Sequence, residues 1–286
     1  MLSYQHIYHA GNFADVHKHA ILALLLKTLV PKAPKLAVLD THAGRGVYDL
    51  SSEEAQKTAE FESGALHFWN SGTLPQDLRD IVAKFNPEGG LKVWPGSAAI
   101  AREMMRPSDP LVCIERHPGE FAELKQALGG KPNTSIQKDD GFEALVNLLP
   151  LSTRKGLVIV DPSFEIKAEY ALTAKQVHKA WKKWNAATYL VWYPVLEAEG
   201  HKQMLLALRK TDIKDVLVST LRLEEPPAEN FRMLGAGVAI VNPPWPEAVL
   251  ASLTQAIAEA MPVKTTGEVF WLDNRRIDPA TGRLDD

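Results

Sequence analysis

Apolar and polar positions alternate along this chain of 286 residues in a pattern that predicts strands and helices in turn. Short apolar runs recur, and each is followed by a stretch in which apolar residues have helical spacing. The predicted strands are residues 36–39, 111–114, 134–137, 157–160, 189–192, 216–221 and 238–241. The predicted helices include residues 118–128, 141–149, 174–184 and 198–210. Such alternation is typical of βαβ units, so we predict a doubly wound α/β fold with a mostly parallel sheet.

Two segments interrupt this rhythm. A leading helix is expected to begin after Asn12, which can cap it with Asp15 at the third helical position, and to end at Pro31. Residues 50–95 contain helical patterns but no parallel strand, and a structureless loop of that length is improbable. We therefore expect a helical insertion there. The predicted organisation is a leading segment (1–34), a sheet domain (35–49 and 96–274), the insertion (50–95) and a flexible tail (275–286).

Composition narrows the class of protein. Apolar residues make up 45% of the chain and charged residues 23%, which are ordinary globular values. The single cysteine, Cys113, excludes an internal disulfide, fits a reducing compartment and lies in a predicted strand as a core thiol. We see neither a run of about 20 apolar residues nor a signal peptide. We expect a soluble, cytoplasmic protein.

The net charge of −3 tells against a generalised basic nucleic-acid binder. Local basic clusters occur at Lys32 and Lys35, in residues 175–183 and at residues 209–210. Each is most simply interpreted as a solvated helix face.

Acidic residues follow successive predicted strands: Asp40, Glu115, Asp140 and Asp161. The carboxyl ends of parallel strands meet at one edge of a sheet, so these side chains are expected to share one site. The glycine-bearing loop 41–46 allows a ligand close to the backbone, and Glu115 can accept hydrogen bonds from ribose hydroxyls. The loop is not G-x-G-x-x-G and does not open a helix directly, which leaves no helix N-terminus for a pyrophosphate. A nucleoside without phosphates, of which S-adenosylmethionine is the common one, fits better.

The last of these strand ends carries Asp161-Pro162-Ser163-Phe164, a variant of the D-P-P-Y tetrad with which some methyltransferases hold a planar amine. A carboxylate and the prolyl carbonyl can accept both N–H bonds of an exocyclic amine and favour a pyramidal nitrogen. An aromatic ring at position 164 can stack on the base, which is worth about 1–3 kcal/mol. Ser163 replaces the usual second proline. The loss of stiffness costs at most about 1 kcal/mol of preorganisation. We expect an active enzyme.

Several motifs together resemble the RlmJ-type family, which methylates N6 of an adenine in 23S ribosomal RNA. They are "YHAGNFADVHKH", "LDTHAG", "PGS", "CIERHP", "KDDGFEAL", "DPSFE" and "LVWYPV". The resemblance covers nearly the whole chain in matching order, including the insertion. It implies a Rossmann-like, class I S-adenosylmethionine-dependent methyltransferase sheet whose last strand is antiparallel.

The resemblance also implies roles for individual residues. Asp161 is the implied catalytic acid, with Pro162 and Phe164 beside it, and Tyr4 and His6 lie on the substrate side. The implied cofactor contacts are His19, His42, Ser97, Glu115, Asp140, Gly141 and Asp161.

A rival tetrad, Asn242-Pro243-Pro244-Trp245, follows the predicted strand 238–241 and fits the tetrad pattern better. In a methyltransferase sheet this last strand is antiparallel, so its carboxyl end emerges at the edge away from the cofactor. We therefore favour Asp161 over Asn242.

Four histidines, His6, His9, His17 and His19, fall close together and suggest a metal site. On a helix His17 and His19 point about 200° apart, and H-E-x-x-H is absent. We predict no metal, and a lid made of Tyr4 and His6. The tryptophans at 94, 181, 184 and 192 are expected to pack in the core or between helices. For Trp181 and Trp184, which lie among lysines, contact with RNA is the alternative.

The sequence therefore predicts methylation of an adenine N6 in 23S ribosomal RNA, on protein-free or assembling large-subunit RNA. The insertion and residues 175–183 are expected to supply basic contacts, and the protein is expected to be a monomer without membrane association. Two alternatives stay open. One is a DNA adenine-N6 methyltransferase, which presents the same amine; the other is a catalytically silent RNA-binding assembly factor, which only Ser163 supports.

Overall fold

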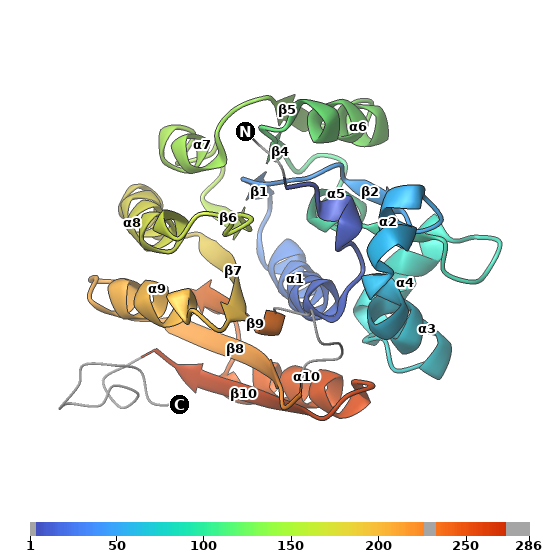
Figure 1. Cartoon of the computed structure of the whole chain (residues 1–286). Coiled ribbons are helices and arrows are strands. Elements are labelled where there is room, and N and C mark those ends of the chain that lie inside the picture. The colour runs from blue at the N-terminus through green and yellow to red at the C-terminus, as the bar shows by residue number, and fades with distance from the viewer. Residues whose placement is uncertain (1–3, 226–232, 273–286) are drawn as a thin grey trace.

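The computed structural model describes residues 4–225 and 233–272 and confirms the predicted α/β class. Its strands form a two-stranded ribbon, β2-β3, and an eight-stranded sheet in the order β10-β8-β9-β7-β6-β1-β4-β5 (Figure 1). The large sheet consists of β1 (Leu36–Asp40), β4 (Leu111–Ile114), β5 (Thr134–Gln137), β6 (Lys155–Val160), β7 (Thr188–Leu196), β8 (Val216–Leu223), β9 (Met233–Val241) and β10 (Thr265–Trp271). The predicted flexible tail, residues 275–286, lies outside the described residues.

Strand direction follows the prediction for all seven expected strands. Strands β5, β4, β1, β6 and β7 are parallel, and β9 pairs antiparallel with both β7 and β8. The eighth strand, β10, pairs antiparallel with β8 at the edge of the sheet and was not predicted. Exposed and partly buried residues alternate along β10, so it lacks the continuous apolar run that marks the buried strands.

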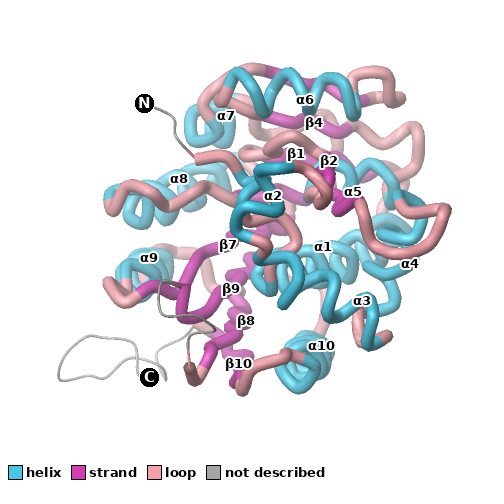
Figure 2. Tube along the Cα trace, turned by 45° about the vertical axis from the view of Figure 1, so that its right-hand side comes forward, coloured by secondary structure: helices cyan, strands magenta, loops and turns pink. Residues whose placement is uncertain are grey.

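Helices cover both faces of the large sheet (Figures 1 and 2). One face is covered by α7 (Gly141–Asn147), α8 (Ala168–Lys183) and α9 (Gly200–Arg209), and the other by α1 (Phe13–Lys32), α5 (Ser97–Met104) and α10 (Glu247–Ala260). Helix α6 (Pro118–Leu128) follows β4. In the described part of the chain, no helix is both long and apolar enough to cross a membrane.

The alternation of side chains along a strand decides which helices each strand residue meets. Leu36 and Val38 of β1 belong to the core under α1 and α5, whereas Ala37 belongs to the core under α8. Continuing this alternation past the apolar part of β1 places Asp40 on the side of α1 and α5. The same parity carries Asp161, two residues after Ile159, toward α1.

The leading helix begins as predicted, because the Asn12 side chain accepts a hydrogen bond from the backbone N–H of Asp15 at 2.9 Å. Pro31 does not end the helix, contrary to expectation, since α1 runs on to Lys32. A proline in the last turn removes only one helical N–H bond and keeps a helical φ, so the chain tolerates it there.

The insertion leaves and rejoins the main domain through the ribbon of β2 (Val47–Asp49) and β3 (Val93–Pro95). Between these strands the chain forms, as expected, mostly helix: α2 (Glu53–Thr58), a π-helical turn (Glu62–Leu66), α3 (His67–Ser71) and α4 (Gln76–Phe85). The helices lie beside α1 (Figure 2). The ribbon was not predicted because three-residue strands give no periodic signal.

Candidate active site

A cavity of about 650 Å³ opens at the carboxyl ends of the parallel strands, a volume typical of sites for small ligands. Its walls come from α1, from the segment before α1 and from the loops that follow β1, β4, β5 and β6. The cavity brings together nearly all the residues singled out from the sequence: Tyr4, His6, His19, His42, Ser97, Glu115, Asp140, Gly141, Asp161 and Pro162. Their roles stay predictions, but their common location is a property of the fold.

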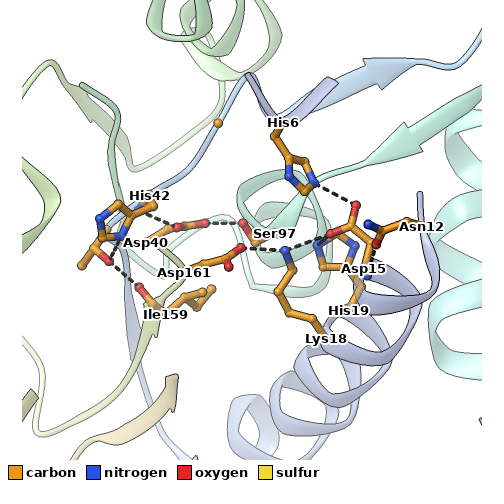
Figure 3. Close-up of polar contacts among 12 residues, drawn as sticks. His6, Asn12, Asp15, Lys18, His19, Asp40, His42, Ser97, Ile159 and Asp161 are labelled. Carbon is orange, nitrogen blue, oxygen red and sulfur yellow. Dashed lines mark hydrogen bonds and ion pairs between the residues drawn. The ribbon is translucent and has the colours of Figure 1, made fainter. Parts of the chain in front are cut away.

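Asp161 is held in the cavity by Lys18 of α1 (Figure 3). The Lys18 Nζ lies 2.6 Å from Asp161 Oδ2 and 2.9 Å from Asp15 Oδ1, and both Lys18 and Asp15 are buried. Burial alone lowers the pKa of Lys18, but the two carboxylates outweigh burial and raise it above the usual value. Lys18 is therefore a permanent cation between two carboxylates, and it fixes one oxygen of Asp161.

The chain of contacts continues from Asp15 to the N-terminal segment. His6 Nε2 lies 2.9 Å from Asp15 Oδ2, and Tyr4 Oη lies 2.9 Å from His6 Nδ1. Burial works against ionisation of Asp15, but His6, Lys18 and His19 together hold its pKa well below the ordinary value. Tyr4 and His6, predicted on the substrate side, are thus linked to Asp161 through Asp15 and Lys18.

His17 and His19 contact different parts of the molecule, as their helical spacing predicts. His17 Nε2 forms a 2.7 Å hydrogen bond with Ser219 Oγ in the core, whereas His19 stacks on Trp94. Burial lowers the pKa of both histidines to about 3, so both are neutral at pH 7. No group of three or more His, Cys, Asp or Glu side chains within residues 4–225 and 233–272 is arranged to hold a metal ion.

Asp40 fixes the loop after β1 and the side chain of Ser97 by accepting hydrogen bonds from both. Ser97 Oγ donates to Asp40 Oδ2 at 2.6 Å, and the backbone N–H of His42 donates to Asp40 Oδ1 at 3.3 Å (Figure 3). Asp40 is fully buried, and burial raises its pKa to about 7 although the Ser97 bond opposes the shift. Asp40 therefore supports His42 and Ser97, which line the cavity, without lining it itself.

The acids after β4 and β5 organise the loops around them. Glu115 Oε2 accepts from the backbone N–H of Gly44 at 2.9 Å, which ties the glycine loop to the end of β4. Asp140 caps α7 by accepting from the backbone N–H of Phe142 at 2.9 Å, and its other oxygen pairs with Arg116 at 2.6 Å. Both carboxylates keep lone pairs for a ligand, so they suit hydroxyl or amino donors of a nucleoside.

The wall of the cavity carries more negative than positive charge. The cationic side chains in its wall are Lys18 and Arg116, and each is paired with a carboxylate. The carboxylate side chains are Asp15, Glu60, Glu115, Glu120, Asp140, Asp161, Glu165 and Glu169. Such a wall disfavours a pyrophosphate and favours a ligand with positive charge. S-adenosylmethionine, a nucleoside with a sulfonium and no phosphate, fits these residues.

Phe164 departs from the prediction. Its ring is only 5% exposed and packs on Tyr170 at 4.5 Å between ring centroids, and the residue is not among those that line the cavity. Its backbone is in the left-handed region, with φ 53°, which is uncommon for a bulky residue. We expected this ring beside the substrate, but the described conformation turns it into the core under α8. Stacking by Phe164 stays a prediction that this geometry does not support.

Asn242, at the head of the rival tetrad, lies at the opposite edge of the sheet, as its antiparallel strand predicts. Val241 pairs with Tyr189 at the beginning of β7, far from the carboxyl end of that strand. Asn242 Nδ2 donates to the carbonyls of Asn185 and Ala187, so its amide fastens a turn. Asn242 is also absent from the cavity wall.

Sequence reasoning missed Lys18 and gave Asp15 only a capping position. A lysine between two histidines, directly before the apolar run of the leading helix, was the available signal, since burying a cation requires an acidic partner. Asp15, three residues earlier, is one such partner, but the contact with Asp161 bridges 143 positions of sequence and required the fold.

Comparisons with known proteins identify the family of this chain. Residues 33–272 match the family described as Ribosomal RNA large subunit methyltransferase D, RlmJ. The chain is 34% identical over 285 residues to the Ribosomal RNA large subunit methyltransferase J of Escherichia coli K12, covering 99% of this chain and 96% of that protein. The protein of the same name from Haemophilus influenzae is 36% identical over 249 residues, which are 86% of this chain and 88% of that protein. A crystal structure of a Legionella pneumophila protein matches with a TM-score of 0.84 and 31% identity, covering 92% of this chain and 98% of that one.

Proposed function

The chain belongs to the RlmJ family of ribosomal RNA large subunit methyltransferases, and on that premise we propose that it methylates N6 of an adenine in 23S ribosomal RNA, with Asp161 as the catalytic residue. As a member of this family it is a methyltransferase with S-adenosylmethionine as methyl donor. The observation that carries the proposal is the position of Asp161, whose carboxylate is fixed by Lys18 in the same cavity as the predicted cofactor residues.

Asp161 and Pro162 supply the two acceptors that an exocyclic amine needs. Lys18 holds Asp161 Oδ2 at 2.6 Å, which leaves Oδ1 to accept one N–H of the amine. The carbonyl of Pro162 accepts the other, and together they orient the nitrogen lone pair toward the methyl group that the cofactor supplies when bound. Positive charge develops on the nitrogen during transfer, and the carboxylate stabilises it.

Lys18 has the role of a positioning residue. Its Nζ lies 2.6 Å from Asp161 Oδ2 and fixes the orientation of that carboxylate, and Asp15 offsets the charge of Lys18 from the other side. Tyr4 and His6, which hydrogen bond to each other above Asp15, cover this part of the cavity on the substrate side.

The substrate is expected to be RNA in which the target adenine is unpaired and accessible. An adenine has to leave its stack to bring N6 to Asp161, which costs a few kcal/mol and less in an unpaired position. Protein-free or assembling large-subunit RNA meets this condition. The insertion and the N-terminal segment flank the cavity on one side, and we assign them to substrate binding.

The test is methyl transfer from labelled cofactor to 23S ribosomal RNA from cells that lack this gene. The wild-type protein is expected to label one adenine at N6, and Asp161→Ala is expected to lower kcat by roughly 10²–10³-fold, the range for a lost transition-state contact. Cofactor binding, measured by calorimetry, should persist in Asp161→Ala.

Asn242→Ala is the matched control, because Asn242 heads the same type of tetrad at the other edge of the sheet. It should retain turnover while losing about 1–2 kcal/mol of stability, since its amide donates two hydrogen bonds to backbone carbonyls. Loss of turnover in Asn242→Ala with activity in Asp161→Ala would reverse the assignment. Preferential labelling of duplex DNA would identify a DNA enzyme, and no labelling of either nucleic acid would leave the silent assembly factor.

A further inference from the structure

The cavity continues past Asp161 into an arm whose walls are mostly apolar. The cofactor residues predicted after β1, β4 and β5 lie on one side of β6 in the sheet, and this arm lies on the other, over β7 and β9. We call it the apolar arm and define it by Ile166, Leu172, Trp192, Pro194, Leu196 and Met233. It is continuous with the space beside Asp161, where the Lys18 Nζ lies 5.6 Å from the ring centroid of Trp192.

Glu169 is a carboxyl group at this arm whose bonding is incomplete. It lies in the first turn of α8 and lines the cavity, and its Oε2 atom is buried with no hydrogen-bond partner among the described residues. Burial raises the pKa of Glu169 above its ordinary value. A desolvated carboxyl oxygen without a donor is unfavourable, so a ligand that donates a hydrogen bond there would complement it.

Ile166 is the second unusual feature of this region. Its side chain is 62% exposed, and it and Val249 are the exposed large apolar residues of the described chain. Ile166 lies five residues after Asp161, at the rim of the arm. An exposed apolar side chain beside a cavity indicates a contact surface rather than a solvated loop.

Apolar walls, an indole ring and an unpaired carboxyl group are complementary to a nucleobase. Single-stranded RNA is recognised through splayed bases that stack on aromatic side chains and hydrogen bond through their edges. Carboxylates accept from the exocyclic amine of cytosine, whereas uracil has a carbonyl at that position. A phosphate is a poor fit, because the carboxyl groups of Glu165 and Glu169 also line this region.

We propose that the apolar arm binds a second unpaired nucleobase, a neighbour of the target adenine in the same RNA strand, and that Glu169 accepts a hydrogen bond from its exocyclic amine. This inference rests on the proposed function, since it assumes that the target adenine lies at Asp161. It assigns to Glu169 and Ile166 a role in sequence preference that is separate from methyl transfer.

The experiment uses the full-length protein and 23S ribosomal RNA fragments that contain the target adenine. The nucleotide on each side of that adenine is changed in turn to cytidine, uridine or an abasic ribose. At one of the two positions the wild-type protein should show a KM about tenfold lower for cytidine than for uridine, the size of one hydrogen bond to a charged group. Glu169→Gln should lose this preference, because an amide both donates and accepts.

Ile166→Ala should raise KM severalfold for fragments with a base at that position and leave KM for the abasic fragment unchanged. Its matched control is Val249→Ala on α10, at the other exposed large apolar residue of the described chain. This variant should leave KM unchanged for both kinds of fragment. Equal KM values for all neighbours, or a Glu169→Gln defect that is the same for every fragment, would overturn the second subsite while adenine methylation stands. Failure to methylate any fragment would instead contradict the proposed function.

Discussion

Asp40 is a carboxyl group buried under the glycine loop, and it links pH to stability. Its pKa is about 7 in the folded protein, compared with about 3.9 for an unfolded aspartate, because burial favours the neutral form. Between these values the folded state binds more protons than the unfolded state, so the contribution of Asp40 to stability falls as pH rises toward 7. Asp40→Asn cannot lose a proton and removes this dependence.

We expect the free energy of unfolding of Asp40→Asn to improve relative to wild type by about 2 kcal/mol between pH 5 and pH 7. Chemical denaturation of both proteins at several pH values measures this difference, and other titrating groups cancel in the comparison. Parallel pH profiles for the two proteins would mean that Asp40 is already ionised at pH 5.

At the scale of single residues, the sequence predicted which strand-end side chains share the cavity, but not every side chain that contacts them. Strand-end acids are visible in one sequence because parallel strands end at a common edge, and Glu115, Asp140 and Asp161 do share a cavity. The Lys18 contact was missed because its partner lies in a distant element. The ring of Phe164 was misplaced because sequence pattern carries no information on a left-handed φ at a non-glycine residue.

Between elements, a backbone hydrogen bond joins the insertion to the N-terminal segment. The backbone N–H of Ala65 donates to the carbonyl of Gly11 at 2.7 Å, and a Cβ on Gly64 would lie 2.3 Å from that same carbonyl oxygen. Glu60 of the insertion also accepts hydrogen bonds from Asn12 and pairs with His9. The insertion thereby holds the segment that carries Tyr4 and His6.

Gly64→Ala is expected to push the insertion away from residues 11 and 12, because the obstructing atoms are backbone and cannot rotate aside. The result should be a loss of about 1–3 kcal/mol of stability and a lower kcat/KM, as for other overpacked sites. Gly130→Ala is the control, since a Cβ there meets nothing within 4 Å. Thermal denaturation and methyl-transfer kinetics measure both variants, and a Gly64→Ala protein with wild-type kinetics would argue against the insertion as a support for the site.

Most of the buried strands could be predicted from the sequence, whereas exposed or very short strands could not. All seven predicted strands were found with the expected order of helices. Six of them are apolar runs, as expected for buried strands, whereas β5 has the sequence TSIQ and is only partly buried. Edge strand β10 and the ribbon β2-β3 were missed, since one alternates in exposure and the other has only three residues per strand. A long periodic segment can be recognised from its own sequence. A short or exposed strand is defined by its pairing with another strand, which the sequence pattern does not show.

At the scale of the whole molecule, positive charge is concentrated in one segment of the chain, which could contact the phosphates of one RNA strand. The chain has a net charge of −3, yet residues 170–214 contain eight Lys or Arg and three Asp or Glu. Lys175, Lys179 and Lys182 of α8 are exposed and spaced at i, i+4 and i+7, so they lie along one face of the helix. Like charges at this spacing are mildly unfavourable for a helix, and a phosphate backbone would relieve their repulsion.

The first turn of α8 lines the cavity, so Lys175 and Lys179 lie nearer to it than Lys182 and Lys183 at the far end of the helix, about 20 Å along the axis. Lys183 also donates to the carbonyl of Val146, which gives it a structural contact. Of the basic contacts expected from residues 175–183, Lys175 and Lys179 are therefore the better candidates, because they lie on the part of α8 closer to the cavity.

We expect Lys175→Glu combined with Lys179→Glu to weaken binding of 23S ribosomal RNA and to leave cofactor affinity unchanged. Each lysine that contacts a phosphate should also reduce the slope of log K against log salt by about 1, because fewer counterions are released on binding. Lys125→Glu with Lys131→Glu makes the same change in net charge on exposed lysines at the end of α6 and separates local contacts from overall repulsion. Filter binding across a salt series measures both pairs; equal losses of affinity would show that only net charge matters, and that RNA does not follow α8.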